Sequence, residues 1–354
     1  MGENGRRFRV ALSADYFAGD GVPRAPDLGL SLFDGHAGID HFVLPEFHAV
    51  TKPGQLAGAN GYITMDAGVN AESVRESEDL ISVGRFGMGY DDIDVAACTA
   101  SDVAVFNCPG TVNRSMAEAT IAWMFALSFK VLQKDAQVRT GNWHLAPPAN
   151  LGRELRDRVF GSVGLGGIAR EVHRLLKCFA LGGHLAYDPY VDPALAQGLG
   201  VRLVGLDELL STADFVSIHC PKNQATLNLI AAEHLALMKP GAFLINTARG
   251  GIVNEDALFE ALQSGRLAGA AVDTFVGEPF DGPHRFSALS NVVLAPHSIG
   301  HTEELFRDIG RAACRSMIQL AEGRAPGGLL NREVLEKASF REKWQRIRID
   351  AAPA

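Results

Sequence analysis

Three segments in the second half of the chain place a charged or titratable side chain just after an apolar run that is typical of a buried strand. Arg249 lies in "AFLINTARGG", Glu278 lies in "GAAVDTFVGEP", and His297 ends "NVVLAPH". The carboxyl ends of parallel strands meet at one edge of a sheet, and ligands of open α/β sheets bind at that edge. We therefore expect the three side chains to gather there.

These are the residue types that hydride transfer to a 2-keto acid requires. A guanidinium, here that of Arg249, can hold the carbonyl and carboxylate oxygens of the substrate by a forked contact. An imidazole that titrates near neutral pH, His297, can donate the proton that the developing alkoxide needs. A carboxylate beside the ring, Glu278, would orient the imidazole and raise its pKa.

Each of these residues, taken alone, has a simpler interpretation. Arg249 could pair with a surface carboxylate, Glu278 could be solvated, and His297 could be a buried imidazole with its hydrogen bonds satisfied. Their positions after successive predicted strands favour the catalytic interpretation, because otherwise all three alternatives would have to hold at one edge of one sheet.

A glycine-rich turn near the middle of the chain has the spacing of a dinucleotide-binding site. In "FGSVGLGGIARE", Gly164 allows a tight turn, Gly166 lets a pyrophosphate approach the backbone, and Ala169 is small enough for close packing of helix on strand. A helix predicted over residues 168–179 would direct its first amides at the phosphates. An ordinary strand-to-helix turn that contains glycines is the alternative.

Asp188 strengthens the dinucleotide interpretation. It ends the next apolar run, "HLAYDPY", about twenty residues beyond the glycines, where an acid hydrogen-bonds the adenosine ribose. No arginine follows it directly, so a 2′-phosphate would be repelled and NAD is favoured over NADP. An Asx turn before Pro189 is the structural alternative, and both can hold together.

The elements that must position these residues form two series of strands alternating with helices, the pattern of α/β domains with parallel sheets covered on both faces. The first series is expected at residues 9–13, 41–44, 61–65, 80–84 and 103–107. The second is expected to start at Val159 and to continue at residues 184–187, 201–204, 214–218, 242–246, 269–273 and 291–295. A buried helix over residues 117–129 connects the two series, and residues 14–38 are predicted to form an irregular loop with one short helix.

The composition limits the class of function. A chain of 354 residues suits two domains, and 47% hydrophobic with 21% charged residues is a globular mixture. A net charge of −8 without a Lys/Arg-rich run argues against nucleic acid or an anionic membrane as partner. The most apolar segment, residues 121–129, is too short to span a bilayer. Five cysteines without a CxxC pair predict reduced thiols in the cytoplasm and no metal.

The sequence resembles the D-isomer-specific 2-hydroxyacid dehydrogenase family along nearly its whole length. The resemblance rests on the motifs "GRFGMGYDDIDVAAC", "FNCPGTVNRSMAEAT", "GSVGLGGIARE", "YDPY", "DELLSTADFVSIHCP", "MKPGAFLINTARGGIVNEDAL", "GRLAGAAVDTFVGEP" and "APHSIGHTEE". It implies that Arg249 binds the substrate, that Glu278 orients the histidine, and that His297 transfers the proton.

The resemblance also implies the other contacts of the site. Backbone groups of Gly87, Met88 and Gly89 would hold the substrate carboxylate. The cofactor would contact Gly164, Gly166, Gly167, Ile168, Asp188, Cys220, Pro221, Thr226, Thr247, Ala248, Asp273 and His297. Among these, Asp273 and the Ala248 carbonyl would hold the nicotinamide carboxamide, and Cys220 with Pro221 would line the adenosine pocket.

The family's domain organisation explains why the glycine turn lies in the middle of the chain. Its Rossmann NAD-binding domain is inserted into a second, flavodoxin-like α/β domain that binds the substrate. The resemblance therefore implies a substrate domain at residues 1–112 and 303–354 and a dinucleotide-binding domain at residues 113–302. A cleft between two such domains could close on the substrate and exclude water.

The expected function is that of an NAD-dependent enzyme that interconverts a small 2-keto acid and its D-2-hydroxy acid. The alternative is an NAD-sensing, corepressor-type binding protein on the same scaffold, although the chain ends soon after Leu335 without a long disordered tail. A formate dehydrogenase would need Gln in place of Glu278.

The sequence says least about which substrate is bound and how many copies of the chain assemble. Met65 and Asp66, at the end of a predicted strand, are expected to face the substrate, and an acid there disfavours a distal phosphate. This favours glyoxylate or hydroxypyruvate over 3-phosphoglycerate. The resemblance implies a homodimer. Residues 117–129, with Trp123, could form part of its interface or could be wholly internal core.

Overall fold

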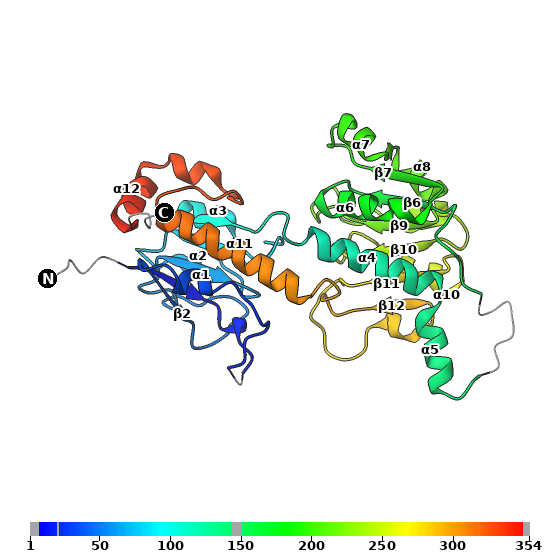
Figure 1. The fold of residues 1–354 in the computed structure, drawn as a ribbon, viewed down its shortest axis with the longest axis horizontal. Coiled ribbons are helices and arrows are strands. Elements are labelled where there is room, and N and C mark those ends of the chain that lie inside the picture. The colour runs from blue at the N-terminus through cyan, green and yellow to red at the C-terminus, as the bar shows by residue number, and fades with distance from the viewer. Residues whose placement is uncertain (1–6, 20, 144–150, 350–354) are drawn as a thin grey trace. The chain divides into compact units, whose positions relative to one another are not determined.

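The computed structural model describes residues 7–19, 21–143 and 151–349. The chain divides into two compact units: unit 1 consists of Met1–Val112 and His301–Ala354, and unit 2 consists of Asn113–Gly300 (Figure 1). The expected domain ends at residues 1–6 and 350–354, and residue 20 of the expected loop, lie outside the described residues.

Unit 1 is built on a five-stranded parallel sheet in the order β2-β1-β3-β4-β5. This is the flavodoxin-like order, so the expected fold of this unit is confirmed. The strands are β1 (Phe8–Leu12), β2 (Ile39–Val43), β3 (Gly61–Thr64), β4 (Ser82–Arg85) and β5 (Ala104–Phe106). The helical segments are η1 (Ala14–Tyr16), α1 (Ser31–Asp34), α2 (Ala71–Val74), α3 (Val95–Ala100), α11 (Glu303–Ala321), η4 (Arg332–Glu336) and α12 (Ala338–Ile347).

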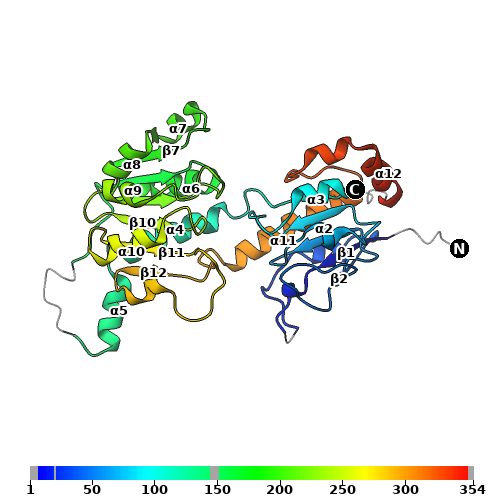
Figure 2. The same cartoon turned by 180° about the vertical axis from the view of Figure 1, so that it is seen from behind.

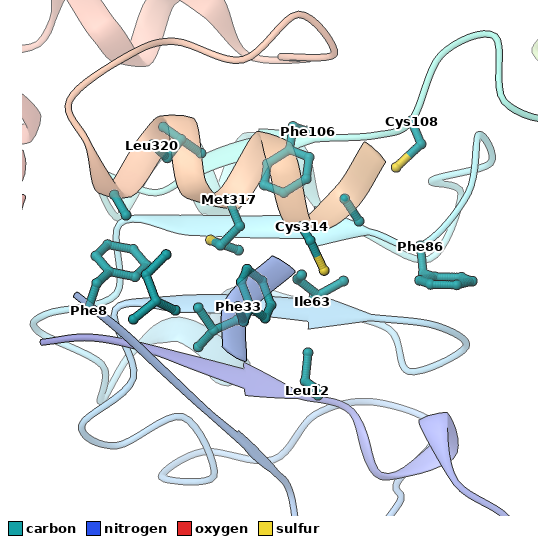
Figure 3. Close-up of a cluster of buried hydrophobic side chains, with 14 of the residues drawn as sticks. Phe8, Leu12, Phe33, Ile63, Phe86, Phe106, Cys108, Cys314, Met317 and Leu320 are labelled. Carbon is teal, nitrogen blue, oxygen red and sulfur yellow. The ribbon is translucent and has the colours of Figure 1, made fainter. Parts of the chain in front are cut away.

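Successive side chains of β1 point to opposite faces of the sheet, so the core of unit 1 has one cluster on each face. Phe8 and Leu12 lie in the cluster that α11 covers, whereas Ala11 lies in the cluster on the other face. Figure 3 shows Met317 and Leu320 of α11 packed over the sheet. A Cβ at Gly61 would lie 2.3 Å from Met317 Sδ, so the thioether of this helix lies directly against the backbone of β3. This packing joins the two parts of the sequence that form unit 1.

Unit 2 contains a seven-stranded parallel sheet in the order β12-β11-β10-β9-β6-β7-β8. Counted from β6, this is the Rossmann order 3-2-1-4-5-6 with one strand added, which confirms the predicted fold class. The strands are β6 (Val159–Val163), β7 (Gly183–Tyr187), β8 (Arg202–Leu203), β9 (Phe215–Ile218), β10 (Phe243–Asn246), β11 (Gly269–Val272) and β12 (Val292–Leu294). The helical segments are α4 (Asn113–Ser128), α5 (Val131–Arg139), α6 (Gly167–Leu176), η2 (Lys177–Phe179), α7 (Pro193–Leu199), α8 (Leu206–Thr212), α9 (Ala232–Leu237), α10 (Glu255–Gln263) and η3 (Arg285–Ala288).

Helices cover both faces of this sheet (Figures 1 and 2). Residues of α4 and α6 pack on one face, and residues of α8, α9 and α10 pack on the other. Trp123 of α4 is 4% exposed and belongs to the core of unit 2. Its suggested place in a dimer interface is therefore wrong, because packing against the sheet of its own unit already covers the ring.

The element boundaries differ from the expected ones in a few places. The helix after the glycine turn ends at Leu176 and continues as the 3-10 turn η2 to Phe179. The irregular segment at residues 14–38 contains two short helical segments, η1 and α1, rather than one. In the described part of the chain no single helix has the length and apolar composition to cross a membrane, although the bent pair α4 and α5, at 59° to each other, has both when taken together.

Candidate active site

The three predicted catalytic residues follow three strands that are neighbours in unit 2. In the register of the sheet Asn246 of β10 lies opposite Val272 of β11, and Val272 lies opposite Leu294 of β12. The loops that bear Arg249, Glu278 and His297 therefore leave the sheet at one edge, side by side.

His297 and Glu278 form a direct contact at this edge. His297 Nδ1 lies 2.7 Å from Glu278 Oε1. The other carboxylate oxygen, Oε2, accepts a hydrogen bond from the backbone amide of Phe275 at 2.9 Å, which fixes the carboxylate within its own loop. Because Nδ1 is engaged, the ring nitrogen left for a substrate is Nε2.

This contact raises the pKa of His297 and lowers that of Glu278, so the charged form of each side chain is favoured. The hydrogen bond from Glu278 raises the pKa of His297 above 6.5, although burial and the charge of Arg249 oppose the rise. Burial opposes ionisation of Glu278, but its hydrogen bonds with His297 and Phe275 outweigh it and hold the pKa below 4.5. The rise expected for His297 is thus confirmed, and the imidazolium is favoured.

Arg249 is placed by a short network at the end of β10. Asn246 Nδ2 donates to the carbonyl of Arg249 at 3.0 Å, and Asn246 Oδ1 accepts from the amide of Ala248 at 3.1 Å. The guanidinium donates through Nη1 to the Ala248 carbonyl at 2.8 Å. That carbonyl has a second lone pair, so it can still accept from a ligand. The neighbouring Thr247 is buried.

Asp273 fixes the loop that presents His297. It is 2% exposed, and its Oδ1 accepts from the amides of Ser298 and Ile299 at 2.8 and 3.1 Å. Its carbonyl accepts from the amide of His297 at 2.8 Å, where the backbone of His297 takes the uncommon φ of +53°. Asp273 therefore positions the histidine. Its expected contact with the nicotinamide carboxamide stays a prediction.

The glycine turn after β6 leaves open backbone at the start of α6. Gly164 has φ +96°, and a Cβ there would lie 2.9 Å from the amide nitrogen of Cys220. Gly166 is exposed, and a Cβ there would meet nothing within 4 Å. Gly166 provides no side-chain cap to α6, so the amides of Gly167 and Ile168 can face an anion.

Asp188 is fixed at the end of β7 by three backbone amides. Its Oδ1 accepts from Tyr190 at 2.9 Å and Val191 at 3.2 Å, and its Oδ2 accepts from Leu165 at 2.8 Å. The Asx turn suggested by the sequence is therefore present, and the same carboxylate bridges to the glycine turn. A carboxylate has about four acceptor positions, which leaves one for a ribose hydroxyl.

The remaining cofactor residues lie in the loop after β9. Burial raises the pKa of Cys220 to about 11, so it stays a thiol. Thr226 Oγ1 donates to the carbonyl of Pro221 at 2.6 Å and accepts from the amide of Asn223 at 2.8 Å, which closes this loop.

The predicted substrate-binding residues lie in unit 1, after β3 and β4. Met65 is buried, and its amide donates to Ser13 Oγ at 2.9 Å. The amide of Gly87 donates to the Arg85 carbonyl at 2.9 Å, so it is not free for a carboxylate. The amides of Met88 and Gly89 have no acceptor within the described residues, and they are the available donors of the loop.

Sequence reasoning missed three features of the site. The side-chain amide of Asn246, the Asp273 hydrogen bonds and the close approach of Gly250 to the loop after β11 were not predicted. A Cβ at Gly250 would lie 2.1 Å from the carbonyl carbon of Phe275. The Asn and the paired glycines of "INTARGG" were the available signal. Among the residues the structure describes, no group of three His, Cys, Asp or Glu side chains could hold a metal.

Residues 121–298, about half of the chain, match the family model described as "D-isomer specific 2-hydroxyacid dehydrogenase, NAD binding domain". The chain belongs to the D-isomer specific 2-hydroxyacid dehydrogenase family. This confirms the resemblance seen in the motifs, and NAD is the cofactor of the matched domain.

Individual relatives of the family are named for different activities. A D-3-phosphoglycerate dehydrogenase of Archaeoglobus fulgidus is 36% identical over 77% of this chain, which spans only 51% of that protein. A glyoxylate reductase of Korarchaeum cryptofilum is 35% identical over 76% of this chain and 81% of its own length. The crystal structure of the TT0316 protein of Thermus thermophilus is also similar, with a TM-score of 0.79 and 28% sequence identity. The match covers 91% of this chain and 100% of the TT0316 chain.

The residues of the glycine turn fit the cofactor of this dehydrogenase family. Gly166 leaves its backbone open, the start of α6 has no capping side chain, and the Asp188 carboxylate reaches the turn through Leu165. A pyrophosphate suits the helix start, and a ribose hydroxyl suits the acid.

Proposed function

We propose that the chain is an NAD(H)-dependent dehydrogenase that interconverts a small 2-keto acid and its D-2-hydroxy acid. The observation that supports this most is the 2.7 Å contact between His297 Nδ1 and Glu278 Oε1, with Arg249 in the adjacent strand-end loop. A 2-keto acid presents a carboxylate and a carbonyl, which a guanidinium and an imidazolium can bind together.

Each residue then has a defined part in the reaction. Bound NADH supplies the hydride for the keto carbon. Arg249 orients the substrate through its carboxylate and carbonyl oxygens. His297 donates the proton on Nε2 to the forming alkoxide, and Glu278 stabilises the imidazolium through Nδ1. In oxidation His297 takes the proton back at the same atom.

We include in the proposal that the substrate is of the glyoxylate or hydroxypyruvate size, that the amides of Met88 and Gly89 bind its carboxylate, and that the enzyme is a cytoplasmic homodimer. The five cysteines are free, which suits a reducing compartment. The exposed apolar residues of α5, Val131, Leu132 and Val138, suit contact with a second copy.

The test is NADH oxidation by the purified protein with a panel of 2-keto acids. The panel includes glyoxylate, hydroxypyruvate, pyruvate and 3-phosphohydroxypyruvate. The His297→Gln variant should lower kcat by roughly 10²-fold or more, the usual effect of general acid catalysis, while NADH binding changes little. A protein that binds NADH but reduces none of the panel would instead support the binding-protein alternative.

A further inference from the structure

The loop that carries Glu278 joins the end of β11 to η3 and is largely exposed. It covers residues 273–284, and within residues 276–280 every residue except Glu278 is exposed. A carboxylate in such a loop must be held in place if it is to stay 2.7 Å from His297 Nδ1. The hydrogen bond from the Phe275 amide to Glu278 lies within the loop, so it does not tie the loop to another element.

Glu255, the first residue of α10, ties one side of the loop to that helix. Its Oε1 accepts a hydrogen bond from the amide of Val276 at 2.7 Å. Glu255 is not needed to cap the helix, because Asn254 Oδ1 already accepts from the amide of Ala257 at 3.0 Å. The dipole of α10 favours a negative charge in its first turn, where Glu255 lies.

His284 lies at the other side of the loop and faces the same carboxylate. Its Nε2 lies 3.5 Å from Glu255 Oε2. Its ring packs against those of Phe275, Phe280 and Phe286, at centroid distances of 4.7, 5.1 and 4.9 Å. The rings of Phe275 and Phe280 also meet edge to face, with centroids 5.5 Å apart. The two sides of the loop therefore meet at one carboxylate, and the acid that orients the histidine lies between them in the sequence.

We propose that Glu255 is a positioning residue, which keeps the Glu278 carboxylate in contact with His297 by holding both sides of the loop. This inference rests on the proposed function. The alternative is that Glu255 only stabilises the fold of unit 2. The two differ in their effect on His297, because a positioning residue changes the contact between His297 and Glu278, whereas a purely structural residue does not.

The pKa of His297 reports whether this contact is present. The hydrogen bond with Glu278 is the main cause of its rise, and the charge of Asp273 also raises it, whereas burial and the charge of Arg249 lower it. Glu255 has its contacts with the loop and not with this ring. Loss of Glu255 should therefore change the pKa of His297 by displacing Glu278.

The experiment follows the pKa of His297 in Glu255→Ala by NMR titration of its imidazole, whose signal is assigned by its absence in His297→Gln. The pKa should fall, because the loop loses its anchor and Glu278 moves away from the ring. The alkaline limb of kcat/KM for reduction should move to lower pH with it. The value of kcat/KM at its optimum should drop roughly 10- to 100-fold, as for other displacements of a positioning loop.

Three further variants separate positioning from stability. Glu255→Gln should keep the wild-type pKa of His297, because an amide oxygen still accepts from Val276. Asp256→Ala is the matched control: Asp256 also lies in the first turn of α10 and pairs with Arg285, but it has no hydrogen bond with residues 273–284, so the pKa should stay. Glu255→Asp keeps the charge at the helix start but is one methylene shorter, so the pKa should fall in it as well, even if Glu255→Ala does not fold.

A folded Glu255→Ala or Glu255→Asp protein in which His297 keeps its wild-type pKa would overturn the inference. When Glu255→Ala is combined with Glu278→Gln, the pKa should equal that of Glu278→Gln alone. A further fall would also overturn the inference, because Glu255 would then act on the ring directly. The titration needs no substrate, so it separates the two proposals: a protein that reduces no 2-keto acid overturns the proposed function, whereas an unmoved pKa overturns this inference alone.

Discussion

At the scale of single residues, the site depends on how two side chains are oriented by their own loops. Glu278 uses Oε2 to accept from the Phe275 amide and Oε1 to contact His297 Nδ1. The hydrogen bond with the backbone limits rotation of the carboxylate, so the imidazole is held with Nε2 outward. The pKa shifts of the pair follow from this contact, and they lead to a direct test.

Glu278→Gln should move the alkaline limb of the pH profile for reduction to lower pH. The carboxylate raises the pKa of His297, and reduction needs the protonated ring, so loss of the negative charge lets the proton leave at a lower pH. The measurement is kcat/KM for reduction against pH. Glu255→Gln is the control, because Glu255 also accepts a loop amide, that of Val276, but its carboxylate lies beside His284. An unchanged limb in an active Glu278→Gln enzyme would disprove the coupling.

Asp188→Ala should weaken NADH binding and reduce the preference for NADH over NADPH. The variant removes an acceptor for the ribose hydroxyl and a charge that repels a 2′-phosphate. It also removes the acceptor of the Leu165, Tyr190 and Val191 amides, so thermal unfolding must be measured beside cofactor affinity. Asp192→Ala, which removes the cap of α7, is the control for a purely structural loss. A wild-type enzyme that uses NADPH as well as NADH would contradict this role.

At the scale of elements, neighbouring strand ends in one parallel sheet bring the catalytic loops together. The loops after β10 and β11 touch at Gly250, where even a Cβ would overlap the backbone of Phe275. The relative position of Arg249 and Glu278 therefore depends on a residue that has no side chain and takes no part in the chemistry.

Gly250→Ala should lower kcat/KM by roughly 10²-fold, because a displacement of about 1 Å in a positioning loop can have that effect. The measurement is kcat/KM together with the midpoint of thermal unfolding. Gly198→Ala in α7 is the control: a Cβ there meets nothing within 4 Å, and the change should be neutral or stabilise the fold by about 0.4–1 kcal/mol. Full activity in Gly250→Ala would show that the two loops can move apart without a loss in kcat/KM.

A buried histidine chain links three elements of unit 2 and should make that unit acid-sensitive. His173 of α6 contacts Ser162 Oγ of β6 through Nε2 at 3.0 Å and His184 Nδ1 of β7 through Nδ1 at 3.0 Å. Burial, with the charges of His184 and His219, lowers the pKa of His173 well below 6.5. Burial also lowers the pKa of His219 to about 4.

The thermal midpoint should therefore fall as the pH drops from 6.5 towards 4. In this window the unfolded chain takes up protons on these histidines while the folded chain does not, so protonation favours unfolding. His173→Gln should start from a lower midpoint at pH 7 but lose less on acidification. Calorimetry over a pH series measures both. Parallel curves for variant and wild type would mean that His173 does not contribute to the acid sensitivity.

At the scale of the whole molecule, α5 carries apolar side chains that the described part of the chain leaves exposed. It is a nine-residue helix with no buried residue, and helices of this length are not stable in water without packing. Val131, Leu132 and Val138 on it are exposed, as is Phe129 just before it. Figures 1 and 2 show α5 extending from the sheet of unit 2. A second copy that covers this surface is the proposed homodimer.

Light scattering at micromolar concentration should give about twice the 37.9 kDa mass of the chain. Val138→Asp should shift the protein towards the monomer, because a charge in an apolar interface loses its hydration. Val22→Asp is the control: this valine of unit 1 is 55% exposed against 56% for Val138, and its replacement should leave the mass unchanged. A monomer mass for the wild type would refute the dimer.

The sequence by itself determined the strands, the fold class and which charged side chains follow neighbouring strands of the unit 2 sheet. These follow from local patterns: apolar runs of strand length, a glycine spacing, and charged residues placed directly after predicted strands. The arrangement of Arg249, Glu278 and His297 was predictable for the same reason, because successive strands of a doubly wound sheet end at one edge.

Only the tertiary structure decided which partner each polar group takes. The contact of His173 with His184, the amides held by Asp188 and the pairing of Arg24 with Asp66 join elements that the local pattern does not connect. The same is true of Trp123, which an apolar helical pattern places equally well in a core or in an interface. Hydrogen bonds act over about 3 Å, so their partners are fixed by sheet register and helix packing rather than by spacing along the chain.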